Sequence, residues 1–396
     1  RFFAIFREYE IMNILFYSPF DVSPEKGGTE RITISVSEAL RQMYGHKCFL
    51  AYGVEIDGKY EKAYFDGRVK IPYDANIELL KDAITNFEID VVIIQGAFNL
   101  VPKFRNCIGK DSHIRILFVH HFEPGWERFF FTIHDAVGDV RESRTLKEFL
   151  RKTMKVIFYR HFKAKHDRKV SLYYKRAYDN ADNIVLLSKN FFKMFQKECG
   201  APNCDKMIAI PNMLSFDFFA DDDCVQKKEK MVLIVSRLEE TQKRISLALD
   251  VWDCVKKNDC AKGWSLHVLG GGRDENFYKR MVKKNKIPDV FFLGVVDPRE
   301  MYLKASLFMM TSRSEGWGLT LTEAMQYGVV PIAFDSYASL HDIIVNGENG
   351  YVVLDGCVRE YANILLDLMN DSKRRMRLAH NAVALSGRFS PDEIVP

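Results

Sequence analysis

The stretch Thr311-Ser-Arg-Ser-Glu-Gly-Trp-Gly-Leu-Thr-Leu-Thr-Glu-Ala-Met-Gln-Tyr-Gly328 decides how the rest of this sequence is interpreted. It follows an apolar run, residues 305–310, that predicts a buried strand. Two glycines then predict a loop, a short helix follows, and Gly328 stands where a left-handed residue ends a helix. A helix that begins beside a strand end presents unpaired backbone N–H groups, which bind anions. The stretch therefore predicts a strand–loop–helix unit with an anion site at its loop.

Two carboxylates accompany this predicted anion site. Glu315 lies in the loop, and Glu323 lies about one turn into the helix. Carboxylates beside an anion site suit a ligand that carries both hydroxyls and phosphates, such as a nucleotide sugar. Two structural alternatives remain open from the residues alone. Thr320-Leu-Thr-Glu323 also fits a capping box, in which Glu323 only satisfies a helix-end N–H, and Glu315 alone fits a solvated loop acid.

Short apolar runs alternate with helical patterns along the whole chain, which is typical of an α/β fold with doubly wound parallel sheets. The predicted strands of the first half are residues 13–18, 47–52, 90–95, 115–120, 183–188 and 207–211. Those of the second half are 231–235, 265–269, 290–293, 307–311, 329–334 and 351–353. We expect two Rossmann-like domains that face each other across a cleft, residues 1–212 and 230–396, with a polar linker at 213–229.

Length and composition agree with this organisation. A chain of 396 residues is long enough for two domains that each have a core. No window approaches 18 uncharged apolar residues, so we expect no membrane-spanning helix. The eight cysteines are scattered and form no Cys-x-x-Cys pair, which favours reduced thiols in a cytoplasmic protein and argues against a zinc site.

The string Ser314-Glu-Gly-Trp-Gly-Leu-Thr-Leu-Thr-Glu-Ala-Met-Gln-Tyr-Gly-Val-Val-Pro-Ile-Ala-Phe334 resembles the signature of a known family. Its Glu-x7-Glu spacing, its glycines and the strand that follows are similar to those of the retaining family-4, or group 1, glycosyltransferases of GT-B fold. The resemblance is strong over residues 230–355 and thin over 40–180. It implies a metal-independent, retaining hexosyltransferase that uses a nucleotide diphosphate sugar, UDP- or GDP-linked, and needs no other cofactor.

The resemblance also implies roles for residues of the second half. Glu315 and the backbone of Gly316, Trp317, Gly318, Leu319 and Thr320 hold the transferred sugar, and Glu323 holds the ribose hydroxyls. Arg237, at a strand end, and Lys243 bind the diphosphate, as two converging cations would. The spacing Arg237-x5-Lys243 is one residue longer than is common in the family, so the neighbouring Arg244 competes with Lys243 for this role.

Residues of the first half complete the predicted site. Gly27-Gly28, after the first strand, permits close backbone approach to a phosphate or sugar, although a Gly-Gly turn is often only structural. His120-His121-Phe-Glu-Pro124 closes a strand at the sheet edge where ligands bind in open α/β sheets. An imidazole there can hold a sugar hydroxyl or donate to the transferred group, although a histidine that only caps a core strand is the alternative. The family has a histidine at this place, and the His-x-x-Pro spacing favours His121. His120 remains the alternative.

Two further segments carry charge. Asp221-Asp-Asp223 is similar to the Asp-x-Asp metal motif of other glycosyltransferases, but it lies in the predicted linker and is interpreted as solvated, so we expect no metal. Residues 141–176 contain 13 Lys/Arg against 3 Asp/Glu, interleaved with aromatic and aliphatic residues. This segment fits a helix that contacts anionic lipid, while an ordinary solvated helix face is the alternative, and no recognisable nucleic-acid-binding module accompanies it.

The sequence thus predicts a glycosyltransferase whose acceptor is a glycan or a lipid-linked intermediate of cell-surface polysaccharide synthesis. We expect it in the cytoplasm, peripherally attached to the inner face of the membrane through residues 141–176. Two alternatives stay open, namely a non-catalytic glycosyltransferase-like subunit of a complex and a GT-B sugar-nucleotide epimerase.

Overall fold

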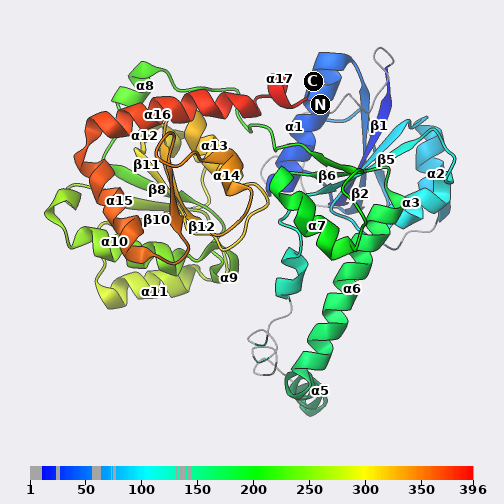
Figure 1. Ribbon diagram of the computed structural model, residues 1–396, viewed down its shortest axis with the longest axis horizontal. Helices are drawn as coiled ribbons and strands as arrows, with labels where there is room; N and C mark the ends of the chain where they lie inside the picture. Colours follow the sequence, from blue (N-terminus) through cyan, green and yellow to red (C-terminus); the bar gives the residue numbers. More distant parts are fainter. Residues whose placement is uncertain are drawn as a thin grey trace. The chain divides into compact units, whose positions relative to one another are not determined.

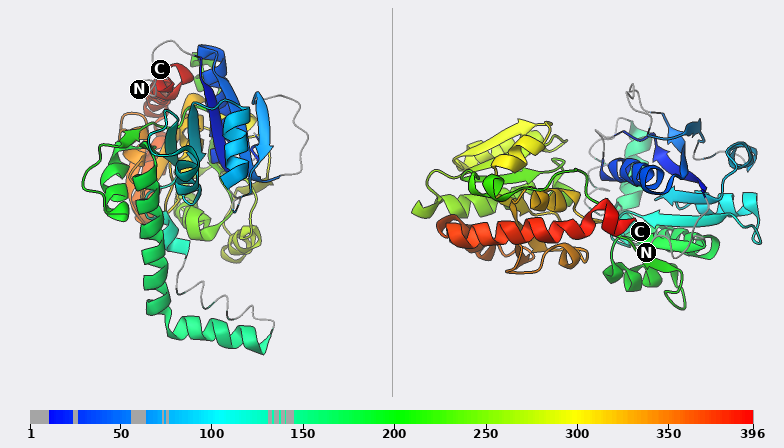
Figure 2. Two further views of the ribbon diagram at one scale, coloured as in Figure 1. Left: turned by 90° about the vertical axis from the view of Figure 1, so that its right-hand side faces the viewer. Right: turned by 90° about the horizontal axis from the view of Figure 1, so that it is seen from above.

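The computed structural model describes residues 11–395 except 24–26, 56–63, 73, 75–76, 131–132, 134–136, 138–139 and 141–144. The chain forms two compact units: the first ends at Ile210 and the second begins at Pro211. Each unit contains one parallel β-sheet with helices on both faces (Figures 1 and 2). The α/β class and the two Rossmann-like units that the sequence predicts are therefore confirmed.

The first unit has a sheet of seven strands in the order β3-β2-β1-β4-β5-β6-β7. Its strands are β1 (Asn13–Phe20), β2 (Lys47–Val54), β3 (Gly67–Lys70), β4 (Val91–Gln95), β5 (Arg115–His120), β6 (Asn183–Leu186) and β7 (Met207–Ala209). Its helices include α1 (Gly28–Tyr44), α2 (Ile77–Asn86), α3 (Leu100–Ile108), α5 (Leu146–Ile157), α6 (Tyr159–Asn180) and α7 (Phe192–Cys199). Strand β3 was not predicted, because Gly67-Arg-Val-Lys70 is an exposed edge strand with little apolar pattern.

The second unit has a sheet of six strands in the order β10-β9-β8-β11-β12-β13. Its strands are β8 (Met231–Val235), β9 (Ser265–Leu269), β10 (Val290–Gly294), β11 (Leu307–Met310), β12 (Val330–Asp335) and β13 (Tyr351–Leu354). Its helices are α8 (Asp222–Gln226), α9 (Glu240–Lys243), α10 (Ile245–Lys256), α11 (Glu275–Asn285), α12 (Arg299–Lys304), α13 (Leu319–Gln326), α14 (Leu340–Ile343), α15 (Val358–Asn370), α16 (Ser372–Ser386) and α17 (Pro391–Ile394). Because both faces of its inner strands are covered, β8, β11 and β12 read as continuous apolar runs.

The segment 213–229, predicted as a linker, takes part in the structure of the second unit. The backbone N–H of Ala220 donates to the carbonyl of Gln326 at 2.8 Å. The side-chain amide of Gln326, at the end of α13, donates to the carbonyls of Phe216 and Phe218. Val225 of α8 packs where a side chain at Gly328 would have to stand. The polar composition of this segment indicated a loop, whereas its backbone is in fact hydrogen-bonded to the helix that carries the predicted site.

No described helix is long and apolar enough to cross a membrane.

Candidate functional site

The loop between β11 and α13 is fixed to the end of α9 by side-chain hydrogen bonds. The guanidinium of Arg244 donates to the carbonyls of Thr311 and Ser312 at 2.8 and 3.0 Å. The buried amide of Gln242 donates to the carbonyl of Ser314 at 3.1 Å. The loop between β11 and α13 is therefore held by the end of α9. The two segments are distant in the sequence: Gln242 and Ser314, for example, are 72 positions apart.

The side chain of Arg244 is held by contacts with the protein. Beside the loop carbonyls, it forms an ion pair with Asp355 at 2.6 Å, and its side chain is 12% exposed. Its backbone has a left-handed φ of 50°, which ends α9 and starts α10. Since all these contacts hold the guanidinium against the protein, this geometry favours Lys243 over Arg244 as the cation for the diphosphate, and the choice remains a prediction.

Lys243 and Glu315 form a direct ion pair. The ammonium Nζ lies 2.5 Å from Glu315 Oε1, and the two side chains are only 14% and 11% exposed. The hydroxyl of Thr311 donates to the carbonyl of Lys243 at 3.0 Å and fixes the backbone of the pair. The family resemblance implies separate roles for these two residues, one on the diphosphate and one on the sugar. The structure places them against each other, so a ligand that contacts one of them also meets the charge of the other.

Arg237 is the accessible cation of this site. Its side chain is 68% exposed and follows β8, as expected. One guanidinium nitrogen donates to Gln242 Oε1 at 3.0 Å, and Glu239 lies 3.8 Å away. Gln242 thus joins Arg237 to the carbonyl of Ser314. Sequence reasoning missed Gln242, because a glutamine in a polar helix carries no pattern that marks it as buried.

The first turn of α13 has no side-chain cap. Its N-cap residue is Gly318, which has a left-handed φ of 88°, and a side chain there would come within 3.2 Å of the Tyr337 hydroxyl. The capping box proposed for Thr320 and Glu323 is wrong, because the helix begins at Leu319 and Glu323 stands in its second turn. The N-cap residue therefore offers no side-chain acceptor to the N–H groups at this helix start. These groups can donate to backbone carbonyls or to a ligand.

Glu323 is buried, with 1% of its surface exposed. The hydroxyl of Tyr302, itself fully buried on α12, donates to Glu323 Oε2 at 3.0 Å. The sequence did not single out Tyr302. A ribose hydroxyl that contacts Glu323 has to reach a carboxylate that Tyr302 already holds in position.

The side chain of Trp317 packs inside the second unit. Its indole is buried and meets the ring of Phe389 edge-on, with centroids 5.2 Å apart. The neighbouring carbonyl of Gly316 accepts a hydrogen bond from Ser339 at 2.9 Å. The side chain therefore anchors the loop in the core of the second unit, and the backbone of residues 316–320 remains the part of the stretch that can meet a sugar.

The two histidines of the first unit lie in different surroundings. His120, at the end of β5, is packed among aromatic rings, and its Nε2 lies 3.0 Å from the hydroxyl of Tyr174. That hydroxyl donates to Glu127 at 2.6 Å. His121 follows the strand end and is hydrogen-bonded through Nε2 to Gln95 Oε1, while its buried Nδ1 has no hydrogen-bond partner in the described part of the chain. Burial lowers the pKa of each histidine to about 3, so both imidazoles are neutral near pH 7.

His120 therefore belongs to a structural network, whereas His121 keeps one ring nitrogen available. The network explains His120 without a ligand. Gln95, at the end of the neighbouring strand β4, fixes the orientation of the His121 ring. The choice of His121 over His120 remains a prediction, and this geometry favours it.

Gly27 and Gly28 begin α1 near the end of β1. Gly27 is the N-cap residue, with an ordinary φ of −62°, and Gly28 is the first helical residue. A side chain at Gly27 would meet only the flexible carboxylate of Glu30, 2.7 Å away. Glycine is therefore not required here by backbone conformation or by close packing, and the predicted contact with a ligand stays a prediction.

The aspartate run has local roles. Asp221 caps α8 by accepting a hydrogen bond from the N–H of Cys224 at 2.8 Å, and Asp223 pairs with Lys227 on the surface. Among the described residues no cluster of His, Cys, Asp or Glu could hold a metal ion.

Gly270-Gly-Gly272, a further glycine run, lets two strand ends approach. A side chain at Gly270 would lie 1.9 Å from the carbonyl oxygen of Ser236, and one at Gly272 would lie 2.3 Å from that of Leu238. These glycines position the loop that carries Arg237.

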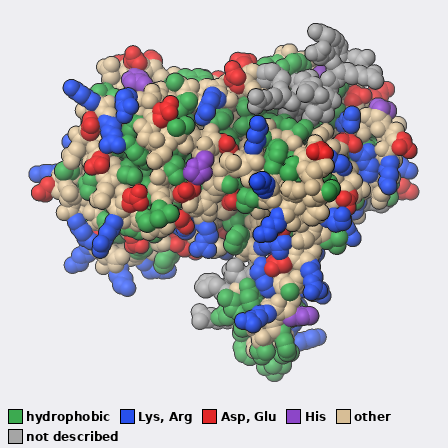
Figure 3. All heavy atoms as spheres, viewed as in Figure 1, with side chains coloured by type: hydrophobic (Ala, Val, Ile, Leu, Met, Phe, Trp, Pro, Cys, Tyr) green, Lys and Arg blue, Asp and Glu red, His purple; other side chains and the backbone are tan. Residues whose placement is uncertain are grey.

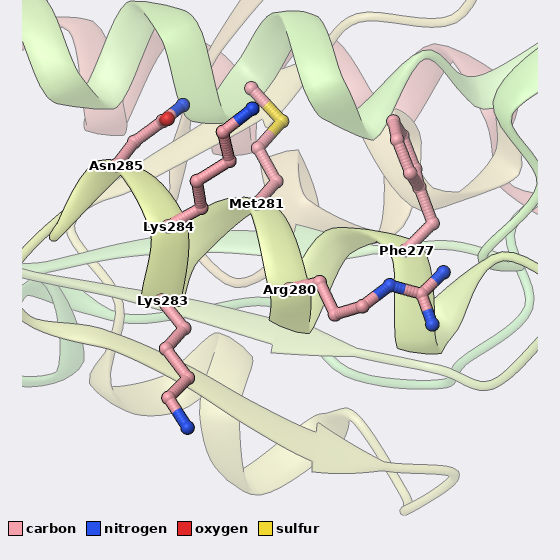
Figure 4. Close-up of a pocket in the computed structure, with 6 residues that line it drawn as sticks. All are labelled: Phe277, Arg280, Met281, Lys283, Lys284 and Asn285. Carbon is pink, nitrogen blue, oxygen red and sulfur yellow. The ribbon is translucent and has the colours of Figure 1, made fainter.

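An open pocket lies elsewhere on the second unit, along α11. Its lining residues all come from that helix and are Phe277, Arg280, Met281, Lys283, Lys284 and Asn285 (Figure 4). None of the predicted site residues takes part in it.

Comparison with known proteins agrees with the fold and with the loop. The family described as "Glycosyl transferases group 1" matches residues 218–384. An uncharacterised glycosyltransferase of Haemophilus influenzae is 22% identical over 383 residues, which are 93% of this chain and 94% of that protein. The amylovoran biosynthesis glycosyltransferase AmsD of Erwinia amylovora is 30% identical over 178 residues, 44% of this chain and 48% of AmsD, so the chain spans about half of that relative.

The structure is also similar to the crystal structure of Anabaena Alr3699/HepE in complex with UDP and glucose. That similarity has a TM-score of 0.70 at 17% identity and covers 97% of each chain. At this identity it concerns the fold. Residues 218–384 thus match the group 1 glycosyltransferases, and the two units have the GT-B fold.

Proposed function

We propose that this protein is a retaining hexosyltransferase that moves a sugar from a nucleotide diphosphate sugar to an acceptor. The observation that carries the proposal is the loop at the start of α13, where the Lys243–Glu315 pair stands beside a helix end without a side-chain cap. Cations and helix N–H groups stabilise a departing diphosphate, and a carboxylate can hold the hydroxyls of the sugar. That the Anabaena protein binds UDP and glucose on the same fold supports this assignment.

In the proposed reaction the bond between sugar C1 and the diphosphate oxygen breaks, and the acceptor oxygen bonds to C1 on the same face. The acceptor proton passes to the departing phosphate oxygen. Arg237 and Lys243 bind the diphosphate, and Glu323, held by Tyr302, binds the ribose hydroxyls. Glu315 and the backbone of residues 316–320 hold the transferred sugar. We assign His121 to the transferred sugar as a neutral imidazole, and Gly27 and Gly28 to donor binding.

The proposed transfer needs no metal ion. Arg237 is exposed and Lys243 is held at the loop, so two fixed cations and a helix end offset the charge that develops on the leaving group. The donor is UDP- or GDP-linked.

We further propose that the acceptor is a glycan or a lipid-linked intermediate of cell-surface polysaccharide synthesis. AmsD is named for amylovoran biosynthesis, and another relative, of Bacillus subtilis, is named a poly(glycerol-phosphate) alpha-glucosyltransferase. The protein would work in the cytoplasm at the inner face of the membrane, in peripheral contact through residues 141–176.

A thermal-shift and product experiment tests the function. The full chain is screened against UDP, GDP and their hexose conjugates, and the anomeric configuration of the product is read by NMR. We expect stabilisation by one nucleotide class, a product with the donor's configuration, and unchanged turnover in EDTA. Turnover that stops in EDTA and returns with Mg²⁺ or Mn²⁺ would refute metal independence.

Two other outcomes would replace the proposal. Release of an epimerised sugar nucleotide without transfer would make the protein an epimerase. Absence of any nucleotide binding would favour a non-catalytic subunit.

A further inference from the structure

Helix α5 exposes an apolar face that the described part of the chain leaves uncovered. None of its residues, Leu146–Ile157, is buried. Five of its apolar side chains are 45–75% exposed, from Phe149 at the low end to Leu146 at the high end. The helix nevertheless has a defined start, because the hydroxyl of Thr145 accepts a hydrogen bond from the N–H of Glu148 at 3.2 Å. Isolated apolar side chains on a surface are ordinary, but a continuous apolar face indicates an interaction surface.

Five apolar residues of α5 recur at helical spacing. They are Leu146, Phe149, Leu150, Met154 and Ile157. Positions separated by three, four, eight and eleven residues lie on one side of an α-helix, so these five side chains form a single face. We call them the apolar face of α5. Figure 3 shows hydrophobic side chains gathered at the free end of the arm that α5 and α6 form.

Cations occupy the other side of the same helix. Lys147, Arg151, Lys152 and Lys155 stand against one acid, Glu148. Lys152 pairs with Glu148 at 2.7 Å, and its side chain is only 14% exposed. Among the described residues no carboxylate pairs with Lys147, Arg151 or Lys155. These three are therefore the cations that α5 offers to a partner, and we call them the α5 cations.

Helix α6 holds α5 away from the sheet of the first unit. The first buried residue of α6 is Val170, and none of the eleven residues before it in the helix is buried. Figures 1 and 2 show α5 lying across the far end of α6. The base of this arm is fixed, because Lys163 donates to the carbonyl of Arg128 at 2.9 Å and Arg128 pairs with Glu198 of α7. The arm is thus a built feature that presents α5 outward.

The charges of α5 indicate which partner covers its apolar face. A second copy of this chain, placed face to face, would cover the apolar residues but would leave the α5 cations, on the other side of the helix, without negative partners. An anionic bilayer offers negative headgroups beside hydrocarbon, and a helix with an apolar face and a basic polar face lies in that interface.

We propose that α5 is an interfacial lipid-binding helix that inserts its apolar face into an anionic bilayer, with the α5 cations at the headgroups. This rests on the proposed function only where it names the acceptor's location: a lipid-linked acceptor is met at the bilayer to which α5 binds. It also narrows the basic segment 141–176 to one twelve-residue helix that carries the contact.

Vesicle co-sedimentation of the full chain tests the proposal. Vesicles of phosphatidylcholine with and without phosphatidylglycerol are compared at low and high salt. We expect binding to the anionic vesicles that weakens as salt rises. Replacing Arg151 and Lys155 by Gln should weaken binding about fivefold per cation at low salt. Leu150→Gln with Ile157→Gln should weaken it by about tenfold or more, because these side chains no longer transfer favourably into hydrocarbon.

Matched controls come from the second unit. Lys283→Gln with Lys284→Gln removes two exposed cations from α11, and Val295→Gln with Val296→Gln replaces two exposed apolar residues. Both control variants should bind vesicles like the parent chain. All α5 variants should keep the parent's UDP or GDP affinity in solution, so a failure of lipid binding and a failure of the proposed transferase function are distinguishable.

Three results would overturn the proposal. They are equal binding to neutral and anionic vesicles, unchanged binding of the α5 variants, and a dimer in sedimentation velocity that Leu150→Gln with Ile157→Gln dissociates. The last result would make a second copy the occupant of the apolar face.

Discussion

Lys243 Nζ and Glu315 Oε1 lie 2.5 Å apart with both side chains largely buried, so the cation assigned to the diphosphate and the carboxylate assigned to the sugar neutralise each other. An incoming diphosphate sugar has to share Lys243 with Glu315. The pair therefore couples the stability of the loop to donor binding, and the two effects can be separated by substitution.

Lys243→Met should destabilise the protein by about 1–3 kcal/mol, because it leaves the Glu315 carboxylate without its cation. Adding Glu315→Gln should restore most of that stability and none of the nucleotide affinity. Denaturant unfolding and calorimetry with UDP and GDP measure the two quantities. Nucleotide affinity that stays at the parent level in Lys243→Met would show that Lys243 serves only the loop.

Arg237 and Arg244 form a matched pair of arginines at one site. Arg237→Gln should lower donor affinity by about tenfold or more with little change in melting temperature, because the side chain is 68% exposed. Arg244→Gln should lower the melting temperature, because the loop carbonyls of Thr311 and Ser312 lose their donors. The opposite pattern would exchange the two assignments.

Glu323→Ala should weaken nucleotide binding by about 1.5–3 kcal/mol, since a ribose diol loses a charge-assisted hydrogen bond. Tyr302→Phe keeps the carboxylate but removes the hydroxyl that holds it, and should weaken binding less. Calorimetry with UDP and with uridine tests this contact. Both ligands carry the ribose, so Glu323→Ala should weaken the binding of both to a similar extent. A lower melting temperature with unchanged nucleotide affinity in both variants would make Glu323 a purely structural residue.

His121→Ala should lower turnover more than donor affinity, as expected for a contact used mainly in the transition state. Burial holds the pKa of His121 at about 3, so the parent's rate should show no titration near pH 6.5. His120→Ala should chiefly lower stability, because it breaks the contact with Tyr174. Normal kinetics in His121→Ala together with slow turnover in a stably folded His120→Ala would identify His120 as the sugar contact.

The two histidines also predict how stability depends on pH. Each stays neutral in the folded chain down to about pH 3, but an exposed histidine in the unfolded chain binds a proton near pH 6.5. The stability contribution is therefore complete above pH 6.5 and is lost as the pH falls below it, by about 1.4 kcal/mol per pH unit for each histidine. Urea unfolding between pH 5 and 6.5 measures how the free energy of unfolding changes with pH. His121→Asn should remove the contribution of one histidine from this slope, because one fewer proton binds on unfolding. An unchanged slope in that variant would contradict a neutral, buried His121.

The sequence by itself determined the two parallel α/β units and the nature of the main loop. Buried parallel strands need continuous apolar runs, so strands such as β5, β8 and β9 coincide with the predicted ranges 115–120, 231–235 and 265–269. Gly328 has the left-handed φ of 68° that its place after the helix predicted. Such features depend on residues close together in the chain, so they can be predicted from the local sequence pattern.

Only the tertiary structure decided how the site residues are used. It paired Lys243 with Glu315, committed Arg244 to loop carbonyls, buried Glu323 against Tyr302, and separated the surroundings of His120 and His121. It also brought in Gln242, Gln95 and Tyr302, which no motif marks. Each of these outcomes joins atoms from segments that are distant in the chain. The sequence specifies the charge and the hydrogen-bonding groups of a side chain. Its partner depends on the tertiary structure, because packing of the sheet determines which strand ends and loops come within about 3 Å of that side chain.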